Sequence, residues 1–303
     1  MANRSRIAMM AGQIGRKLQQ QFPYLFRASH LAELFAKHRN VWKLPKSLTL
    51  HGFIDGLVKE NVLIEIQLDF GMEWFSFYVL PEATVYHIGS YGVPRSYLCH
   101  QSALELLGLT SHKSKEVYIN QEQSAAPAKS KKVALTQKGI DNAFGHERKK
   151  SNSRARFDPY ELVLLKGQST SMLGVIELGA AKKVRVKVTD VERTLIDCVV
   201  RAAYVGGASS VLHAFYLAKK KNLIDVAILR DYFDRMNFIY PYHQSIGFYL
   251  QKAGNYSIDE IDYFYGDSRQ YDFYLEYGME EKEYDPHWRI YYPTPLLHKG
   301  SAD

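Results

Sequence analysis

The stretch from Ser47 to Leu80, SLTLHGFIDGLVKENVLIEIQLDFGMEWFSFYVL, changes its hydrophobic period midway and decides the fold of the N-terminal part of the chain. Apolar residues recur at helical spacing over Ser47–Glu60, and Ser47 is a candidate N-cap. Val62–Leu68 and Trp74–Leu80 are then rich in β-branched and aromatic residues, with a turn predicted over Asp69–Glu73. The pattern therefore predicts a helix followed by a β-hairpin.

Two further helices are predicted before this stretch. Arg4–Gln20 has apolar residues at spacings of three and four, and Ser29 is a candidate N-cap for a helix that runs to Lys37. Three helices followed by a hairpin is the element order of a winged helix-turn-helix, whose third helix enters the major groove of DNA. We therefore predict a winged helix-turn-helix DNA-binding domain over residues 1–80. The alternative is that this winged helix is a protein-interaction module.

The polar face of the third helix predicts the DNA contacts. Short hydroxyl side chains near a helix N-terminus, next to lysines, suit phosphate oxygens. This face has no arginine for bidentate recognition of guanine, so the preferred sequence is left open. The residues predicted to face outward are Thr49, Gly52, Asp55, Gly56 and Lys59. The residues predicted to contact the operator are Arg4, Arg6, Lys43, Lys46, Ser47, Thr49, His51 and Lys59.

A second, mixed α/β domain is predicted over residues 84–303, which makes the whole fold α+β. Gln121–Arg156 shows little helical or strand pattern, and the tail from Asn255 has short aromatic runs that fit either strands or an irregular wrap. The predicted strands are Val85–Ile88, Val117–Asn120, Glu161–Leu165, Gly174–Leu178 and Lys183–Val188. The predicted helices are His100–Leu107, Val191–Ala202, Ser209–Lys219, Asp225–Met236 and Tyr242–Ala253.

The charges are segregated along the chain. Residues 1–60 and residues 129–156 each carry a net charge of +7, and residues 257–285 carry −8. Together with the overall net charge of +7, this distribution favours a nucleic-acid partner over a uniformly solvated surface. The basic insertion over residues 121–156 is a candidate second DNA contact, the alternative being solvated loops. Its candidate residues are Lys129, Lys131, Lys132, Lys149, Lys150, Arg154 and Arg156.

Composition excludes several classes of protein. The 303 residues are 46% hydrophobic and 13% aromatic, which is too apolar for a disordered chain. No apolar run approaches the roughly 18–20 residues of a membrane span, and the N-terminus lacks the apolar core of a signal peptide. Cys99 and Cys198 are too few for a disulfide framework. We therefore expect a cytoplasmic protein without a membrane partner.

Enzymatic chemistry has little support in the sequence. In the block Asp190, Glu192, Arg193, Thr194 and Asp197, the spacing of Arg193 and Asp197 predicts a structural ion pair on one helix face. A metal-dependent nuclease would need carboxylates and a lysine held together, for which Glu177 with Lys187, or Asp190 with Glu192, are the candidates. Cys99 and Cys198 lack the spacing of a zinc site, and there is no phosphate-binding glycine motif. The expectation is a protein that is not an enzyme, with no cofactor and no metal.

Three blocks in order carry a resemblance to a known family. Tyr97–Leu109, YLCHQSALELLGL, resembles the segment SALELHGL, and Thr189–Cys198, TDVERTLIDC, resembles the block TDxERTLxD. His243–Leu250, HQSIGFYL, resembles a late RxGFLL helix. Together they resemble AbiE-type antitoxins, the antitoxin-regulators of type IV toxin–antitoxin systems. The basic insertion and the acidic, tyrosine-rich tail depart from that family's pattern.

The resemblance implies a transcriptional autorepressor that binds inverted repeats in double-stranded operator DNA upstream of its own operon. It also implies a cognate nucleotidyltransferase-like toxin, which such an antitoxin counters without necessarily binding it, as part of phage defence. Two alternatives remain open: a protein that neutralises a toxin by direct contact, and a stand-alone regulator of defence genes. The acidic tail is either a mimic of nucleic acid or a wrap whose tyrosines pack on the domain.

Overall fold

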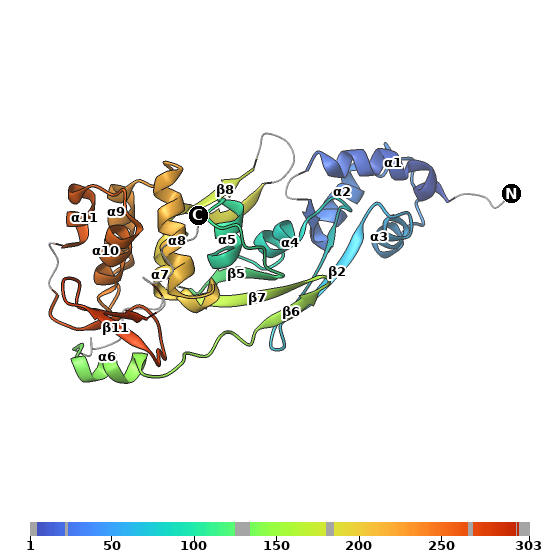
Figure 1. The fold of residues 1–303 in the computed structure, drawn as a ribbon. Helices are drawn as coiled ribbons and strands as arrows, with labels where there is room; N and C mark the ends of the chain where they lie inside the picture. Colours follow the sequence, from blue (N-terminus) through green and yellow to red (C-terminus); the bar gives the residue numbers. More distant parts are fainter. Residues whose placement is uncertain are drawn as a thin grey trace.

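The structure is a computed structural model, and it describes residues 5–21, 24–124, 134–179, 185–265, 269–294 and 296. Over these residues the chain has an α+β fold, which confirms the predicted class, and its strands form three sheets. Figure 1 shows three regions: an N-terminal helical region, a central six-stranded sheet, and a C-terminal region in which helices predominate.

The N-terminal region contains the three helices and the hairpin that the sequence predicts. Strands β1, β3 and β2 form an antiparallel sheet in that order. Ile14, Leu18, Phe53 and Leu57 are almost fully buried, so the helices bury their apolar stripes against one another. The elements are α1 (Arg6–Gln19), β1 (Leu25–Phe26), α2 (Ala28–His38), α3 (Leu50–Lys59), β2 (Ile64–Asp69) and β3 (Trp74–Val79).

Three local predictions in this region are wrong. Helix α2 begins after Arg27 rather than Ser29. Helix α3 begins after Thr49 rather than Ser47, because the Thr49 hydroxyl accepts a hydrogen bond from the Gly52 amide at 3.1 Å. Gly56 faces α1 instead of solvent: a Cβ on Gly56 would lie 2.5 Å from Cδ1 of Ile7. The two helices approach closely at this residue because it has no side chain.

The central sheet has the strand order β6-β7-β5-β4-β9-β8. The pairs β5–β7 and β4–β9 are parallel and the others are antiparallel, so the sheet joins segments far apart in sequence, such as Leu98 opposite Val188. Helices α4 and α5 pack on it. The elements are α4 (Val85–Tyr91), β4 (Ser96–Leu98), α5 (His100–Leu106), β5 (Glu116–Glu122), α6 (Gln137–Phe144), β6 (Arg154–Phe157), β7 (Tyr160–Gly167), β8 (Val175–Leu178) and β9 (Val186–Thr189).

Two predictions for the central region need correction. Val85–Ile88, expected as a strand, forms the first half of helix α4, which is buried on most of its surface and therefore shows no polar face in the sequence. The basic insertion, expected to have little regular structure, contains helix α6 and strand β6. Helix α6 buries only Ile140 and Phe144, which is too short a stripe to reveal a helical period.

The C-terminal region follows the prediction closely until its tail. Helix α10 has the predicted bounds and ends at Gly254, which has a φ of 71°. In the tail, Tyr263–Tyr265 belongs to a helix, and the later aromatic runs contribute to a small three-stranded sheet. The elements are α7 (Val191–Val200), a 3₁₀ turn (Ala202–Tyr204), α8 (Ala208–Lys220), α9 (Val226–Met236), α10 (Tyr242–Ala253), α11 (Ile258–Tyr265), β10 (Phe273–Tyr274), β11 (Lys282–Asp285) and β12 (Ile290–Pro293).

The acidic tail supplies core residues to this region. Phe264, Phe273 and Trp288 are fully buried and pack in the same cluster as α7, α8 and α10. The described part of the tail is therefore integrated into the fold. Deleting residues 257–303 would remove much of this core and is expected to unfold the region. Such a deletion therefore cannot show whether the acidic charges of the tail inhibit DNA binding.

The hairpin of the N-terminal region packs on the central sheet (Figure 1). Its inward residues Leu68 and Phe77 belong to the same buried cluster as Val117 and Leu162 of the sheet. At its tip, Glu73 forms an ion pair with Lys166 of β7 at 2.7 Å. The hairpin and the sheet therefore share one apolar cluster, which is separate from the cluster that α1, α2 and α3 form.

Candidate functional site

The exposed face of α3, with the turn before it, holds most of the residues predicted to contact DNA. Lys43 and Lys46 lie on the turn, and Lys59 lies in the last turn of the helix. All three are exposed, and none of the described acidic side chains forms an ion pair with them. Their charges are therefore free to neutralise an external anion. Ser47, Thr49 and His51 are exposed on the same segment.

Two residues on this face also have local roles. The Thr49 hydroxyl is the N-cap acceptor of α3, so it holds the helix start as well as facing solvent. Nε2 of His51 lies 3.1 Å from Oδ2 of Asp55, and the two side chains are 89% and 59% exposed. The Asp55 carboxylate thus places a negative charge on a surface that is otherwise basic.

Two arginines fix the turn that leads into α3. Nε of Arg6 donates to the carbonyl oxygen of Trp42 at 3.2 Å, which ties α1 to this turn. Nη2 of Arg39 donates to the carbonyl oxygens of Pro45 and, at 3.0 Å, of Leu48. The sequence carries no local signal for this role of Arg39. Arg4 lies outside the described residues.

The second predicted basic surface is only partly described. Lys129, Lys131 and Lys132 lie outside the described residues, whereas Lys149 and Lys150 are exposed. In Figure 1 the segment that carries Lys149 and Lys150 runs between α6 and β6, away from α3. The structure therefore does not bring these lysines together with the basic face of α3.

The two arginines of strand β6 already have acidic partners. Arg154 forms ion pairs with Glu116, at 2.6 Å, and with Glu161 across strands β5, β6 and β7. Arg156 is exposed and pairs with Asp158 at 2.9 Å. Both guanidinium groups are therefore less available to DNA phosphates than Lys149 and Lys150.

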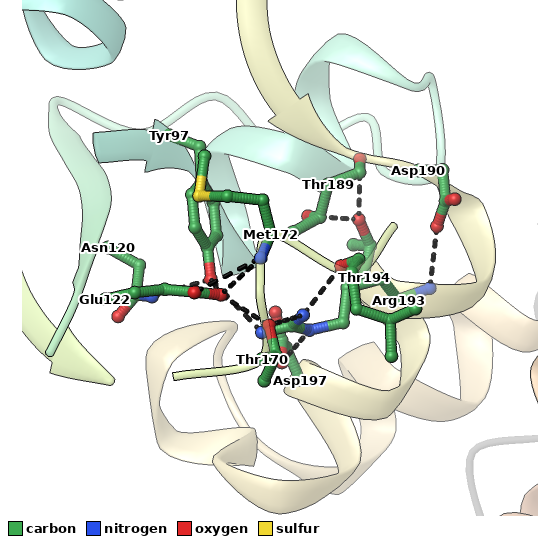
Figure 2. A network of polar contacts seen from close by, with 11 residues as sticks. Tyr97, Asn120, Glu122, Thr170, Met172, Thr189, Asp190, Arg193, Thr194 and Asp197 are labelled. Carbon is green, nitrogen blue, oxygen red and sulfur yellow. Dashed lines mark hydrogen bonds and ion pairs between the residues drawn. The ribbon is translucent and has the colours of Figure 1, made fainter. Parts of the chain in front are cut away.

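A buried polar cluster surrounds Arg193 at the start of α7 (Figure 2). Nε of Arg193 donates to Asp197 at 2.9 Å, and this pair, 4% and 13% exposed, has the geometry that the i, i+4 spacing predicts. The other nitrogens donate to the hydroxyls of Thr170 and Tyr97 and to the carbonyl oxygen of Leu173. Burial by itself would lower the pKa of Arg193, but Asp197, Tyr97 and Glu122 together outweigh burial and raise it.

Glu122 extends this cluster from strand β5. Its buried carboxylate accepts hydrogen bonds from the Thr170 hydroxyl, the Met172 amide and, at 3.4 Å, the Tyr97 hydroxyl. Burial alone would raise the pKa of Glu122, but the hydrogen bonds from Thr170 and Met172, together with the charge of Arg193, outweigh burial and leave the pKa lowered. The cluster thus joins β4, β5, the loop before β8 and helix α7, as Figure 2 shows.

The remaining residues of the predicted motif also stabilise this junction. Asp190 caps α7 by accepting from the Arg193 amide at 2.9 Å, and Glu192 accepts from the Asp225 amide at 2.7 Å. The hydroxyls of Thr194 and Thr189 are hydrogen-bonded at 2.7 Å. Burial raises the pKa of both Asp190 and Glu192. Their carboxylates are occupied by the main chain rather than directed together at a metal.

The residues weighed for metal or thiol chemistry are not clustered. Glu177 is exposed and lies 3.9 Å from Arg185, and Lys187 contacts the ring of Tyr91. Cys99 and Cys198 are buried, and burial raises the pKa of both thiols. Within the described part of the chain, no group of three His, Cys, Asp or Glu side chains is arranged to hold a metal ion. No described helix is long and apolar enough to cross a membrane.

A pocket of about 470 Å³ opens beside the Arg193 cluster. It lies between the end of β7, the C-terminal end of α7 and the segment after α6. Its polar wall includes His100, Arg148 and Arg201, and its apolar wall includes Met236 and Phe238. Sequence reasoning did not identify this pocket, because its residues come from segments with no common motif.

A similar fold is found among solved structures. The crystal structure of the RV2827C protein from Mycobacterium tuberculosis aligns with a TM-score of 0.56 at 11% sequence identity, covering 96% of this chain and 94% of that chain. At this identity the similarity concerns the fold alone. Neither a protein-family model nor a curated protein matches the chain.

Proposed function

We propose that this protein is a DNA-binding transcriptional autorepressor, with residues 1–80 as a winged helix-turn-helix that reads operator DNA. The element order α1-β1-α2-α3-β2-β3, with a small sheet of β1, β3 and β2, supports this interpretation. The observation that carries it is the exposed α3 face, where Lys43, Lys46 and Lys59 have no described acidic partner. Such lysines attract phosphate without regard to sequence.

In this proposal the hairpin tip is not a major DNA contact. Glu73 is held against Lys166 of the sheet, and Glu65 and Asp69 are exposed on the hairpin. The two exposed carboxylates of Glu65 and Asp69 would repel the DNA backbone. Helix α3 and the turn before it are therefore the proposed contact surface, with Arg6 positioning that turn through Trp42.

The proposal extends to an antitoxin role in a type IV toxin–antitoxin system. It is supported by the resemblance of the blocks Tyr97–Leu109, Thr189–Cys198 and His243–Leu250 to AbiE-type antitoxins. The function would be to repress its own operon and to counter a nucleotidyltransferase-like toxin. Direct binding of that toxin is not required by the proposal.

The test is a fluorescence-anisotropy titration with DNA from upstream of the protein's own gene and with a scrambled control, at several salt concentrations. Lys46→Ala and Lys59→Ala should each weaken binding to both DNAs and reduce the slope of log K against log salt by about 0.9. Lys138→Ala is the matched control, because Lys138 is exposed on α6 and has no described ion pair. Preference for the native fragment supports a repressor.

Two results would contradict the DNA-binding proposal. If the wild-type protein binds neither DNA, the winged helix is better explained as a protein-docking surface of a toxin neutraliser. If Lys138→Ala lowers the salt slope as much as Lys46→Ala, the attraction is general and not located on α3.

His51→Ala should change the preferred sequence, whereas Thr49→Ser should preserve the helix cap.

Removing the negative charge of Asp55 should strengthen DNA binding, whereas removing a lysine charge should weaken it. Asp55→Asn removes a carboxylate from the α3 face and should tighten DNA binding about two- to fivefold at low salt, because it lowers repulsion of phosphate. The gain should shrink as salt is added. Glu280→Gln, at an exposed residue of the tail, is the control. Weaker binding by Asp55→Asn would show that the α3 face does not approach DNA.

A further inference from the structure

Arg201 is a half-buried cation without a described acidic partner. It follows α7, where its Nη2 donates to the Tyr204 hydroxyl at 3.0 Å and to the Lys149 carbonyl oxygen at 3.4 Å. No described carboxylate forms an ion pair with it, and its Nε and Nη1 have no hydrogen-bond partner among the described residues. Partly buried charges are normally paired, so an unpaired guanidinium on a pocket wall indicates an absent anion.

A second arginine lies on the same wall. Arg148 lines the pocket with Arg201, and its Nη1 donates to the Tyr277 hydroxyl at 3.2 Å. It too has no ion pair with a described residue. Burial lowers the pKa of Arg201, and the charge of Arg148 lowers it further, so the two cations destabilise each other. A bound anion between them would remove this repulsion.

His100 is an independent sign of a ligand. It lines the pocket, is only 7% exposed, and neither of its ring nitrogens has a hydrogen bond of standard geometry with a described residue. The charge and the main chain of Asp197 would raise the pKa of His100, but burial outweighs them and lowers this pKa to about 4, which keeps the ring neutral. A neutral buried imidazole can accept and donate one hydrogen bond each.

We propose that this pocket binds a small phosphorylated organic molecule, with its phosphate between Arg148 and Arg201. Two arginines suit a phosphate dianion, because guanidinium groups donate to its oxygens in pairs. Met236 and Phe238 form the apolar wall for the organic part, and His100 supplies a polar contact. The volume of about 470 Å³ exceeds that needed for a free phosphate and lies within the range of ligand pockets.

The only described carboxylate on the pocket wall is already neutralised. Asp197 is paired with Arg193 at 2.9 Å. Lys166 also lines the pocket, and its amine is bound to Glu73. The unpaired charge of the pocket is therefore that of Arg148 and Arg201, which is positive.

The test is calorimetric titration of the full chain with AMP, adenosine and inorganic phosphate, in a buffer without phosphate or sulfate. AMP should bind, and adenosine should bind at least about tenfold more weakly, because it lacks the charged group. Arg201→Met should weaken AMP binding by about ten- to hundredfold. Arg148→Met should act in the same direction, and since Arg148 is exposed, this variant tests the site without disturbing the core.

Controls separate this pocket from the DNA surface and from general charge effects. Arg235→Met removes an exposed arginine of α9 and should leave AMP binding unchanged. Arg201→Met should leave the affinity for operator DNA unchanged, so failure of the repressor proposal would not affect this result. Circular dichroism verifies that each variant is folded.

Each outcome decides the proposal. Loss of AMP binding in both arginine variants supports it. Inorganic phosphate could also bind the wild-type protein as tightly as AMP, with this binding lost in both arginine variants. That result supports the phosphate site and identifies free phosphate as its ligand. The proposal is overturned if AMP does not bind the wild-type protein, if adenosine binds as tightly as AMP, or if both arginine variants bind AMP normally. It is also overturned if Arg201→Met weakens DNA binding as much as AMP binding, since the ligand would then be a DNA phosphate.

Discussion

Arg193→Met is expected to lower the free energy of unfolding by about 3–5 kcal/mol. The Arg193 side chain is 4% exposed. Its guanidinium donates hydrogen bonds to Asp197, Thr170, Leu173 and Tyr97. Methionine fills much of the same volume but donates nothing, so the loss reports on charge and hydrogen bonding rather than on a cavity. The nearly buried Asp197 carboxylate would lose its partner, and the buried Glu122 would lose a nearby positive charge.

The measurement is urea unfolding followed by circular dichroism, with the free energy obtained by linear extrapolation. Arg235→Met is the matched control: it breaks an i, i+4 pair with Asp231 at 3.1 Å, but both side chains are 58% exposed. Its effect should stay within about 0.5 kcal/mol. If Arg193→Met costs no more than this control, the buried cluster does not stabilise the junction of β4, β5 and α7.

A double variant separates the pair from its surroundings. Arg193→Met with Asp197→Leu removes both charges, so it should recover part of the stability lost in the single variant. Recovery should be incomplete, because Thr170, Leu173 and Tyr97 also lose the donors of Arg193. The assigned ion pair would be contradicted if the double variant lost more free energy of unfolding than the two single variants lose when their losses are added.

Trp288→Ala is expected to cost about 3–5 kcal/mol, the range for truncating a large buried side chain. Trp288 is fully buried, its indole nitrogen donates to Gln251 at 2.9 Å, and its carbonyl oxygen accepts from Gln244 at 2.7 Å. It therefore holds the tail to helix α10. Trp74→Ala is the control: Trp74 is 73% exposed at the hairpin tip, and its loss should stay within about 0.5 kcal/mol.

The contact between Trp288 and helix α10 can also be tested by a substitution in the helix. A Cβ on Gly247 would lie 2.2 Å from two ring carbons of Trp288, so Gly247→Ala should cost about 1–3 kcal/mol by overpacking. Gly12→Ala in α1 is the matched change, because its nearest described side-chain atom would be 3.9 Å away. It should instead stabilise by about 0.5–1 kcal/mol through helix propensity. A stabilised Gly247→Ala, or a Trp288→Ala as mild as Trp74→Ala, would show that the tail is not part of the core.

The sequence by itself determined the elements whose signals are local. The change of hydrophobic period after Glu60 predicted α3 and the hairpin, and Gly254 marked the end of α10. The pairing of Arg193 with Asp197 follows from one turn of helix. In each case the decisive residues are neighbours in the chain, so the backbone geometry alone brings them together.

The tertiary structure decided what depends on packing between distant segments. Helix α4 is buried on most of its surface, so its sequence lacks the polar face that marks a helix, and the sheet it covers pairs Leu98 with Val188. Arg193 also donates a hydrogen bond to Tyr97, which is 96 positions away in the sequence. Arg148 and Arg201, likewise from separate segments, line one pocket. No local period encodes such contacts, because they form only when the chain folds to bury apolar surface and pair its polar groups.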